Sequence, residues 1–169
     1  MHILMCNDDG ILADGLRHLA SYLSQYYRIT VVAPANEQSA KSHALTTEVP
    51  LKLDACNGED ENPRLYALTG TPSDCMKFGL SYLLTDDMPD LVISGINHGF
   101  NLGSDVLYSG TVSAAMESGF YGIPGLALSV ERYSVERGDE MHPFIHELIE
   151  KIYVAGQFSG LLNVNFPLR

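Results

Sequence analysis

The chain has 169 residues, of which 46% are hydrophobic, and its formal net charge is −11 at pH 7. This length and composition allow one globular domain with its own core and exclude a disordered chain, and no apolar run approaches the roughly 18 residues that a membrane-spanning helix needs. The acidic balance argues against a protein that coats duplex nucleic acid, which requires a basic face, so we expect neither duplex nor membrane partners.

Two features bear on where the protein resides. Cys6, Cys56 and Cys75 are odd in number and lack the spacing of a metal site, which is typical of reduced thiols. The N-terminus enters an apolar strand without the basic segment and cleavage site of a signal peptide. Both features lead us to expect a cytoplasmic protein.

The first predicted strand, residues 2–6, leads directly into Asn7-Asp8-Asp9-Gly10. Two adjacent carboxylates raise each other's pKa unless water or a cation compensates their charge. In open α/β sheets, ligands bind beyond the carboxyl ends of the strands, and Gly10 permits a turn that lets both side chains converge there. Taken alone, the tetrapeptide fits a divalent-metal site at Asp8 and Asp9 and an ordinary polar turn about equally well.

Predicted strands and helices alternate along the rest of the chain. Strands are expected at 28–33, 49–53, 65–68, 90–94, 125–130 and 161–165, and helices at 13–25, 71–84, 110–120 and 142–154. The helix from 71 has a clear start, with Thr71 as N-cap, Pro72 at the first helical position and Asp74 three residues after the cap. The alternation predicts an α/β fold over residues 1–169, with a mostly parallel sheet covered by helices in three α/β/α layers.

Polar side chains also follow two of the later strands. Ser39 lies in the polar loop after the second strand, and Asn97 follows the strand at 90–94. Because parallel strands end at one edge of a sheet, both residues can meet the two aspartates there. Carboxylate, hydroxyl and amide oxygens suit a hard cation such as Mg²⁺ or Mn²⁺. Taken singly, Ser39 is more simply a loop serine and Asn97 a turn residue.

A second candidate site is Tyr108-Ser109-Gly110-Thr111, where a loop passes into a helix. Small hydroxyl residues around a glycine leave backbone N–H groups free to face a phosphate, although Ser109 or Thr111 could equally be a plain N-cap. Asn101 could reach the same anion or only satisfy its loop. Tyr108 is expected to pack its loop, with stacking on a base as the alternative. Neither a G-x-G-x-x-G fingerprint nor a P-loop is present.

Five spaced motifs resemble the SurE family of survival proteins, which are metal-dependent nucleotidases. They are Asn7-Asp8-Asp9-Gly10, Ala33-Pro34 with Ser39, Gly70-Thr71-Pro72-Ser73-Asp74-Cys75, Ser94-Gly95-Ile96-Asn97-His98-Gly99 and Tyr108-Ser109-Gly110-Thr111. The resemblance covers almost the whole chain. It implies a Rossmann-like fold, a homodimer or homotetramer, and a phosphomonoesterase acting on nucleoside 5′- and 3′-monophosphates. Some members also trim short polyphosphate.

The resemblance also implies a role for individual residues. One divalent ion per subunit, Mg²⁺ or Mn²⁺, would be held by Asp8, Asp9, Ser39 and Asn97, and phosphate would contact Asn101, Ser109, Gly110 and Thr111. Asp8 and Asp9 are the expected catalytic residues, one of them as general base toward water. The chain departs from the family in two places. Ala40 stands where many members have Gly, so a positive φ would strain it, and the chain stops at Arg169, without the usual C-terminal tail.

A Mg²⁺-binding receiver-like signalling module, or a nucleotide-binding module without hydrolase activity, is the alternative. Receiver domains also carry paired acidic residues after the first strand. They need an aspartate at the end of the third strand and a lysine at the end of the fifth. When the weak edge strand at 49–53 is left out of the count, the third and fifth predicted strands end at Leu68-Thr69-Gly70 and Leu128-Ser129-Val130, which argues against a receiver domain.

Overall fold

A computed structural model describes residues 1–156 and 158–167. Its strands are β1 (His2–Cys6), β2 (Arg28–Pro34), β3 (Leu53–Ala55), β4 (Arg64–Leu68), β5 (Leu91–His98), β6 (Gly125–Val130) and β7 (Leu161–Phe166). Its α-helices are α1 (Asp14–Leu23), α2 (Pro72–Phe78), α3 (Gly110–Glu117) and α4 (Val135–Ile149). Short π or 3₁₀ turns follow α2, α3 and α4 and precede α3. Arg169, where the sequence stops, lies outside the described residues.

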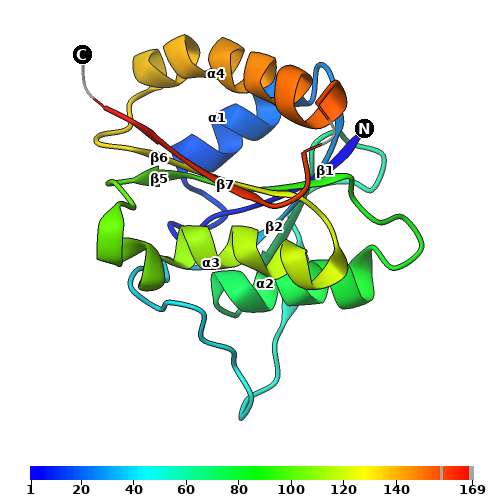
Figure 1. Ribbon diagram of the computed structural model, residues 1–169. Coiled ribbons are helices and arrows are strands. Elements are labelled where there is room, and N and C mark those ends of the chain that lie inside the picture. Colours follow the sequence, from blue (N-terminus) through cyan, green and yellow to red (C-terminus); the bar gives the residue numbers. More distant parts are fainter. Residues whose placement is uncertain (157, 168–169) are drawn as a thin grey trace.

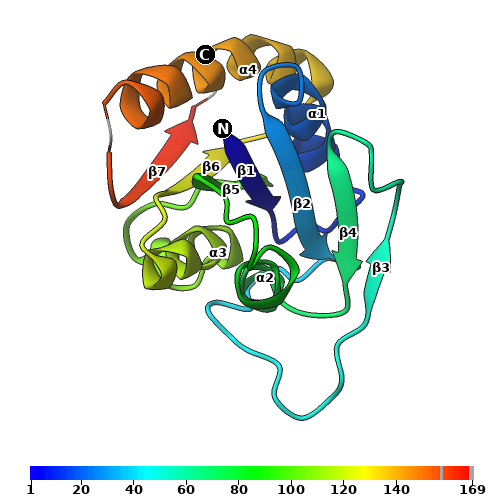
Figure 2. The same ribbon diagram turned by 90° about the vertical axis from the view of Figure 1, so that its right-hand side faces the viewer.

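The described strands form one sheet in the order β3-β4-β2-β1-β5-β6-β7. Neighbouring strands are parallel except for β3 and β4, which are antiparallel. Helices α1 and α4 cover one face of the sheet, and α2 and α3 cover the other (Figures 1 and 2). The expected three-layer α/β/α fold is therefore confirmed.

The central strand β1 contributes to both layers of the core. Ile3 and Met5 pack in the cluster that includes α1 and α4, whereas Leu4 and Cys6 pack in the cluster that includes α2. A strand covered on both faces needs apolar residues at every position, which explains the continuous apolar run. Because β1 is central, the turn that follows it lies in the middle of the sheet's carboxyl edge.

The starts of two predicted elements differ from the structure by several residues. Helix α4 begins at Val135 rather than 142, and Ser134 caps it by accepting a 3.2 Å hydrogen bond from the Arg137 N–H. Pro143 lies inside this helix. Because proline is most common at the first helical position, the sequence pattern placed the start of the helix next to Pro143. The edge strand expected at 49–53 is instead β3, because only residues from Leu53 onward pair with β4.

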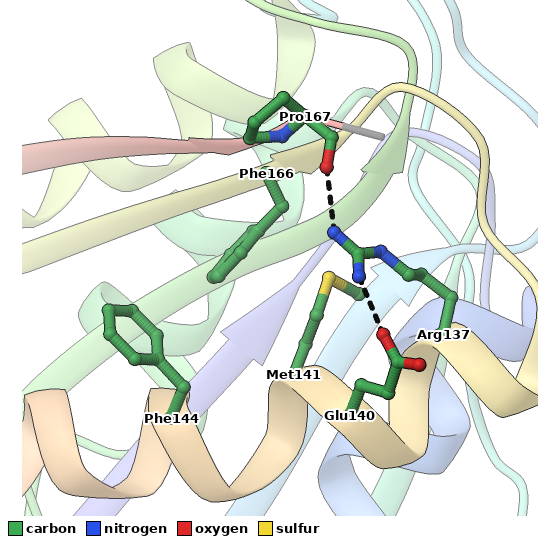
Figure 3. Close-up of a pocket in the computed structure, with 6 residues that line it drawn as sticks. All are labelled: Arg137, Glu140, Met141, Phe144, Phe166 and Pro167. Atoms are coloured by element: carbon green, nitrogen blue, oxygen red, sulfur yellow. Dashed lines mark hydrogen bonds and ion pairs between the residues drawn. The ribbon is translucent and has the colours of Figure 1, made fainter. Parts of the chain in front are cut away.

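A groove of about 500 Å³ lies between α4 and the end of β7 (Figure 3). Phe144 and Phe166 face each other across it, edge to face, with ring centroids 5.8 Å apart. The Arg137 guanidinium donates 2.7 Å hydrogen bonds to the Pro167 carbonyl and to Glu140. This groove contains none of the predicted site residues. No helix of the described residues is both long and apolar enough to cross a membrane.

Candidate functional site

The turn after β1 is closed by the side chain of Asn7. Its amide nitrogen donates to the Gly10 carbonyl at 3.0 Å, and its amide oxygen accepts from the Gly10 N–H at 3.2 Å. Asn7 is buried. Gly10 has a φ of +101°, a backbone conformation that residues other than glycine rarely adopt. The turn therefore fixes Asp8 and Asp9 at the carboxyl edge of the sheet.

A β-bulge in β5 positions Asn97. The predicted strand ended at Ser94, but β5 continues to His98, with a shift in register between Ser94 and Asn97. Gly95 has a φ of +131°, and a Cβ there would lie 2.3 Å from the Leu128 carbonyl oxygen, so only glycine fits. Bulges redirect side chains. The Asn97 amide nitrogen donates to the Gly99 carbonyl at 2.8 Å, which leaves the amide oxygen available to a ligand.

The loop between β2 and β3 brings Ser39 to the same edge. The Gln38 N–H donates to the Asp8 carbonyl at 2.8 Å, which ties this loop to the turn after β1. The Ser39 hydroxyl donates to the Glu37 carboxylate at 2.8 Å. Ala40 has a φ of +59°, which is the condition under which alanine would be strained at this position. Sequence reasoning missed Glu37, since a glutamate two residues before a serine is no signal by itself.

These segments surround one cleft of about 320 Å³. The residues that line it are Asp8, Asp9, Ser39, Ala40, Asn97, His98, Phe100, Asn101, Asp105, Tyr108 and Ser109. All four predicted oxygen donors are among them. These donors follow or lie in β2, β1 and β5, which are neighbours in the sheet, although the residues are up to 89 positions apart in the sequence.

The two carboxylates share a poorly solvated corner of this cleft. Burial raises the pKa of Asp8, and the hydrogen bond from Thr111 offsets part of that effect. Burial and then the neighbouring Asp8 charge raise the pKa of Asp9 to about 6. Two such carboxylates are costly to ionise together without a cation. In the described residues no group of three or more His, Cys, Asp or Glu has metal-binding geometry. The carboxylate, hydroxyl and amide oxygens that line the cleft are the kind of ligands that a hard ion such as Mg²⁺ prefers.

The start of α3 adjoins this corner. The Ser109 hydroxyl accepts from the Val112 N–H at 3.1 Å, and the Ser109 carbonyl accepts from the Ser113 N–H at 3.0 Å. The first four N–H groups of a helix have no partner within it. Here the Ser109 side chain satisfies that of Val112, whereas those of Gly110 and Thr111 face no such cap. A Cβ on Gly110 would lie 3.0 Å from the Asp8 Cβ, so this backbone packs directly against the acidic pair.

The remaining predicted phosphate contacts have further partners. Thr111 is buried, and its hydroxyl donates to the Asp8 carboxylate at 2.5 Å, so its backbone N–H is the group available to an anion. The Asn101 amide nitrogen donates to the Ser129 hydroxyl at 2.8 Å, which ties its loop to β6. Tyr108 was expected to pack its loop, but it is 67% exposed at the cleft, so that prediction is wrong.

Comparison with known proteins assigns the chain to a family. A family profile described as Survival protein SurE matches residues 3–169. The chain belongs to the SurE family. It is 49% identical over 168 residues to a protein named 5′-nucleotidase SurE from Thermoanaerobacter sp. (strain X514), an alignment that covers 99% of this chain and 66% of that relative.

Two further comparisons agree with this SurE assignment. The chain is 48% identical over 167 residues to 5′-nucleotidase SurE from Caldanaerobacter subterraneus subsp. tengcongensis, covering 98% of the chain and 65% of the relative. It superposes on the crystal structure of the SurE protein from Aquifex aeolicus with a TM-score of 0.84 and 37% identity, covering all of this chain and 67% of that one. The chain thus spans 65–66% of the length of these two curated relatives.

Proposed function

We propose that this chain carries the active site of a divalent-cation-dependent phosphomonoesterase. Its substrates would be nucleoside 5′- and 3′-monophosphates, which it would hydrolyse to nucleoside and phosphate, with short polyphosphate as a further substrate. One observation carries the proposal: Asp8 lines the cleft of oxygen donors and also touches the open start of α3. A cation and a phosphate bound there would be neighbours. The relatives named 5′-nucleotidase SurE support a nucleotidase.

Asp8, Asp9, Ser39 and Asn97 would hold one Mg²⁺ or Mn²⁺. Once bound, the ion would supply positive charge to the phosphoryl oxygens and would acidify water. The chain's own groups would position the substrate. The N–H groups of Gly110 and Thr111 would hold phosphoryl oxygens at the positive end of α3.

Asp9 is the better placed of the two carboxylates to accept a proton from the attacking water. Asp8 is buried and already accepts a hydrogen bond from Thr111, whereas Asp9 is only partly buried at the cleft wall. In the proposed reaction the water oxygen forms a bond to phosphorus while the bond between phosphorus and the nucleoside oxygen breaks. The water's proton passes to the Asp9 carboxylate, and the departing nucleoside oxygen takes up a proton from solvent. A general base of this kind typically contributes about 10²–10⁴-fold to the rate.

The test is phosphate release from 5′-AMP and 3′-AMP with Mg²⁺ or Mn²⁺. Activity should disappear in EDTA and return with either ion. Asp9→Asn should lower kcat at least about 100-fold, because the amide can neither accept the proton nor balance the cation's charge. Asp60→Asn, an exposed residue of the turn before β4, serves as the matched control and should keep full activity.

Two outcomes would contradict the proposal. Turnover that survives in EDTA or in Asp9→Asn would separate the reaction from this cleft. A stable acyl phosphate after incubation with acetyl phosphate would instead support the signalling alternative. The structure gives that alternative little support, because β5, the strand that pairs with β1 on the side away from β2, carries Asn97 and no carboxylate between Leu91 and His98.

A further inference from the structure

Ser39 differs from the other proposed ligands because its hydroxyl is both donor and acceptor. A neutral hydroxyl binds a cation through an oxygen lone pair, so its proton must point away from the ion. The Ser39 hydroxyl donates that proton to the Glu37 carboxylate at 2.8 Å. We propose that Glu37 is a positioning residue: it accepts the Ser39 proton and thereby turns the hydroxyl lone pairs toward Asp8 and Asp9. The proposal rests on the cation site proposed above.

The backbone of this segment is fixed independently of the Glu37 side chain. Gln38, which lies between Glu37 and Ser39, donates its N–H to the Asp8 carbonyl at 2.8 Å. The Ile11 N–H also donates to the Pro34 carbonyl at 2.8 Å, which ties the turn after β1 to the end of β2, where this loop begins. Changing the exposed Glu37 side chain should therefore alter the direction of the Ser39 hydroxyl without moving the loop.

Two of the other three proposed ligands are likewise oriented by a hydrogen bond to a second group. The Asn97 amide nitrogen is held by the Gly99 carbonyl, which leaves its oxygen for the cleft. One Asp8 oxygen is held by the Thr111 hydroxyl. Groups that orient metal ligands in this way typically contribute about 10–100-fold to metal affinity. Glu37 would orient the Ser39 hydroxyl in the way that the Gly99 carbonyl orients the Asn97 amide.

The experiment is a Mn²⁺ titration of the full chain without nucleotide. Electron paramagnetic resonance measures the free Mn²⁺ at each step and gives the Mn²⁺ affinity. Glu37→Ala should weaken Mn²⁺ binding about 10–100-fold. Glu37→Gln, whose amide oxygen still accepts the Ser39 proton, should recover most of that loss. In a Ser39→Ala background, Glu37→Ala should change the affinity by no more than about twofold, because no hydroxyl remains to orient. Glu48→Ala removes an exposed carboxylate farther along the same loop and should leave the affinity unchanged.

Each contrary outcome has its own meaning. Glu37→Gln and Glu37→Ala could instead lower the Mn²⁺ affinity equally, with a loss that persists in the Ser39→Ala background and vanishes at high salt. That result would show that Glu37 acts only through its charge. If Glu37→Gln abolishes Mn²⁺ binding as completely as Asp8→Asn does, Glu37 is itself a ligand of the ion. Either result overturns the positioning role while leaving the cation site intact. Absence of Mn²⁺ binding by the unsubstituted chain would overturn the proposed function as well. Thermal unfolding in EDTA checks that each variant is folded.

Discussion

At the scale of single residues, Ala40 occupies a conformation that suits glycine. Its φ of +59° lies in the left-handed region, one residue after Ser39. This conformation costs a residue with a Cβ about 1–2 kcal/mol. We therefore expect Ala40→Gly to raise the free energy of unfolding by about 1 kcal/mol, after allowance for the greater freedom of glycine in the unfolded chain. Urea unfolding in EDTA measures this change.

Ala155→Gly is the matched control for that substitution. Ala155 is exposed and has a φ of −87°, which suits alanine, so glycine there should lower the stability by about 0.4–1 kcal/mol through the unfolded state. If both substitutions destabilise the protein equally, the left-handed backbone at residue 40 carries no strain.

Tyr108 presents an exposed ring beside the start of α3. Stacking of a base on an aromatic ring is worth about 1–3 kcal/mol. Under the proposed function, Tyr108→Ala should raise KM for a nucleoside monophosphate roughly 5- to 150-fold, whereas Tyr108→Phe should not. Kinetics with ribose 5-phosphate supply the control, because this substrate has no base and should not distinguish the variants. A matching rise in its KM would point to a phosphate-side effect instead.

At the scale of elements, the long loop between β2 and β3 projects below α2 and α3 (Figure 1). It is attached to both helices. The His43 ring forms a 2.7 Å hydrogen bond with the carboxylate of Glu117, a residue of α3 that is only 4% exposed. Thr46 donates to Asp74 of α2 through its N–H and its hydroxyl. The loop that carries Ser39 is therefore held by α2 and by α3, and Ser109, the N-cap of α3, lines the cleft.

His43→Ala should detach part of this loop. It leaves the buried Glu117 carboxylate without this partner, which should cost about 1–3 kcal/mol of stability. Amide hydrogen exchange should speed up in residues 39–46 more than in the sheet. Lys52→Ala removes an exposed ion pair with Asp54 at the far end of the loop and should cost no more than about 1 kcal/mol. Uniformly faster exchange throughout the chain would show global destabilisation rather than release of the loop.

The elements also show what the sequence could predict. The start of α2 is encoded locally: the Thr71 hydroxyl accepts the Asp74 N–H, and the Asp74 carboxylate accepts the Thr71 N–H. The predicted bounds of β6 are confirmed as well. By contrast, the continuation of β5 depends on packing against β6, because Gly95 lies against the Leu128 carbonyl. No local pattern reports a contact between residues so far apart.

The candidate site was likewise predictable from the sequence only in part. The convergence of Asp8, Asp9, Ser39 and Asn97 follows from the rule that parallel strands end at one edge, and the structure places all four around one cleft. The hydrogen bonds that orient them could not be predicted. They depend on side-chain directions set by the turn at Gly10 and by the bulge in β5.

At the scale of the whole molecule, the site exists only when the sheet is assembled, so stability should depend on pH and on cations. The pKa of Asp9 is about 6 in the folded chain, against a model-compound value of 3.8. The folded chain therefore retains a proton that the unfolded chain has lost. The free energy of unfolding should fall as pH rises between these two values in EDTA. Asp9→Asn should reduce this slope.

Added Mn²⁺ should reverse the trend, because the ion competes with the proton for the same carboxylates. At about 100 times its dissociation constant, a ligand specific to the folded state stabilises it by about 2.7 kcal/mol. Thermal unfolding from pH 4 to pH 8, with and without Mn²⁺, should show a larger Mn²⁺ effect at the alkaline end. The lowered pKa values of His2 and His142 act in the opposite direction, so the comparison with Asp9→Asn isolates the carboxylate. An Mn²⁺ effect that is independent of pH would argue against binding at this pair.

The close packing of Gly110 on Asp8 limits how such a protein could change its substrate. A side chain at residue 110 would push the acidic turn aside, so the inner wall of the cleft cannot be enlarged or narrowed without disturbing both halves of the site. New substrate preferences would have to arise at the outer rim, where Phe100 and Tyr108 lie. Under the proposed function, selection for different leaving groups should therefore alter Phe100 and Tyr108 first and leave Asp8 and Gly110 unchanged.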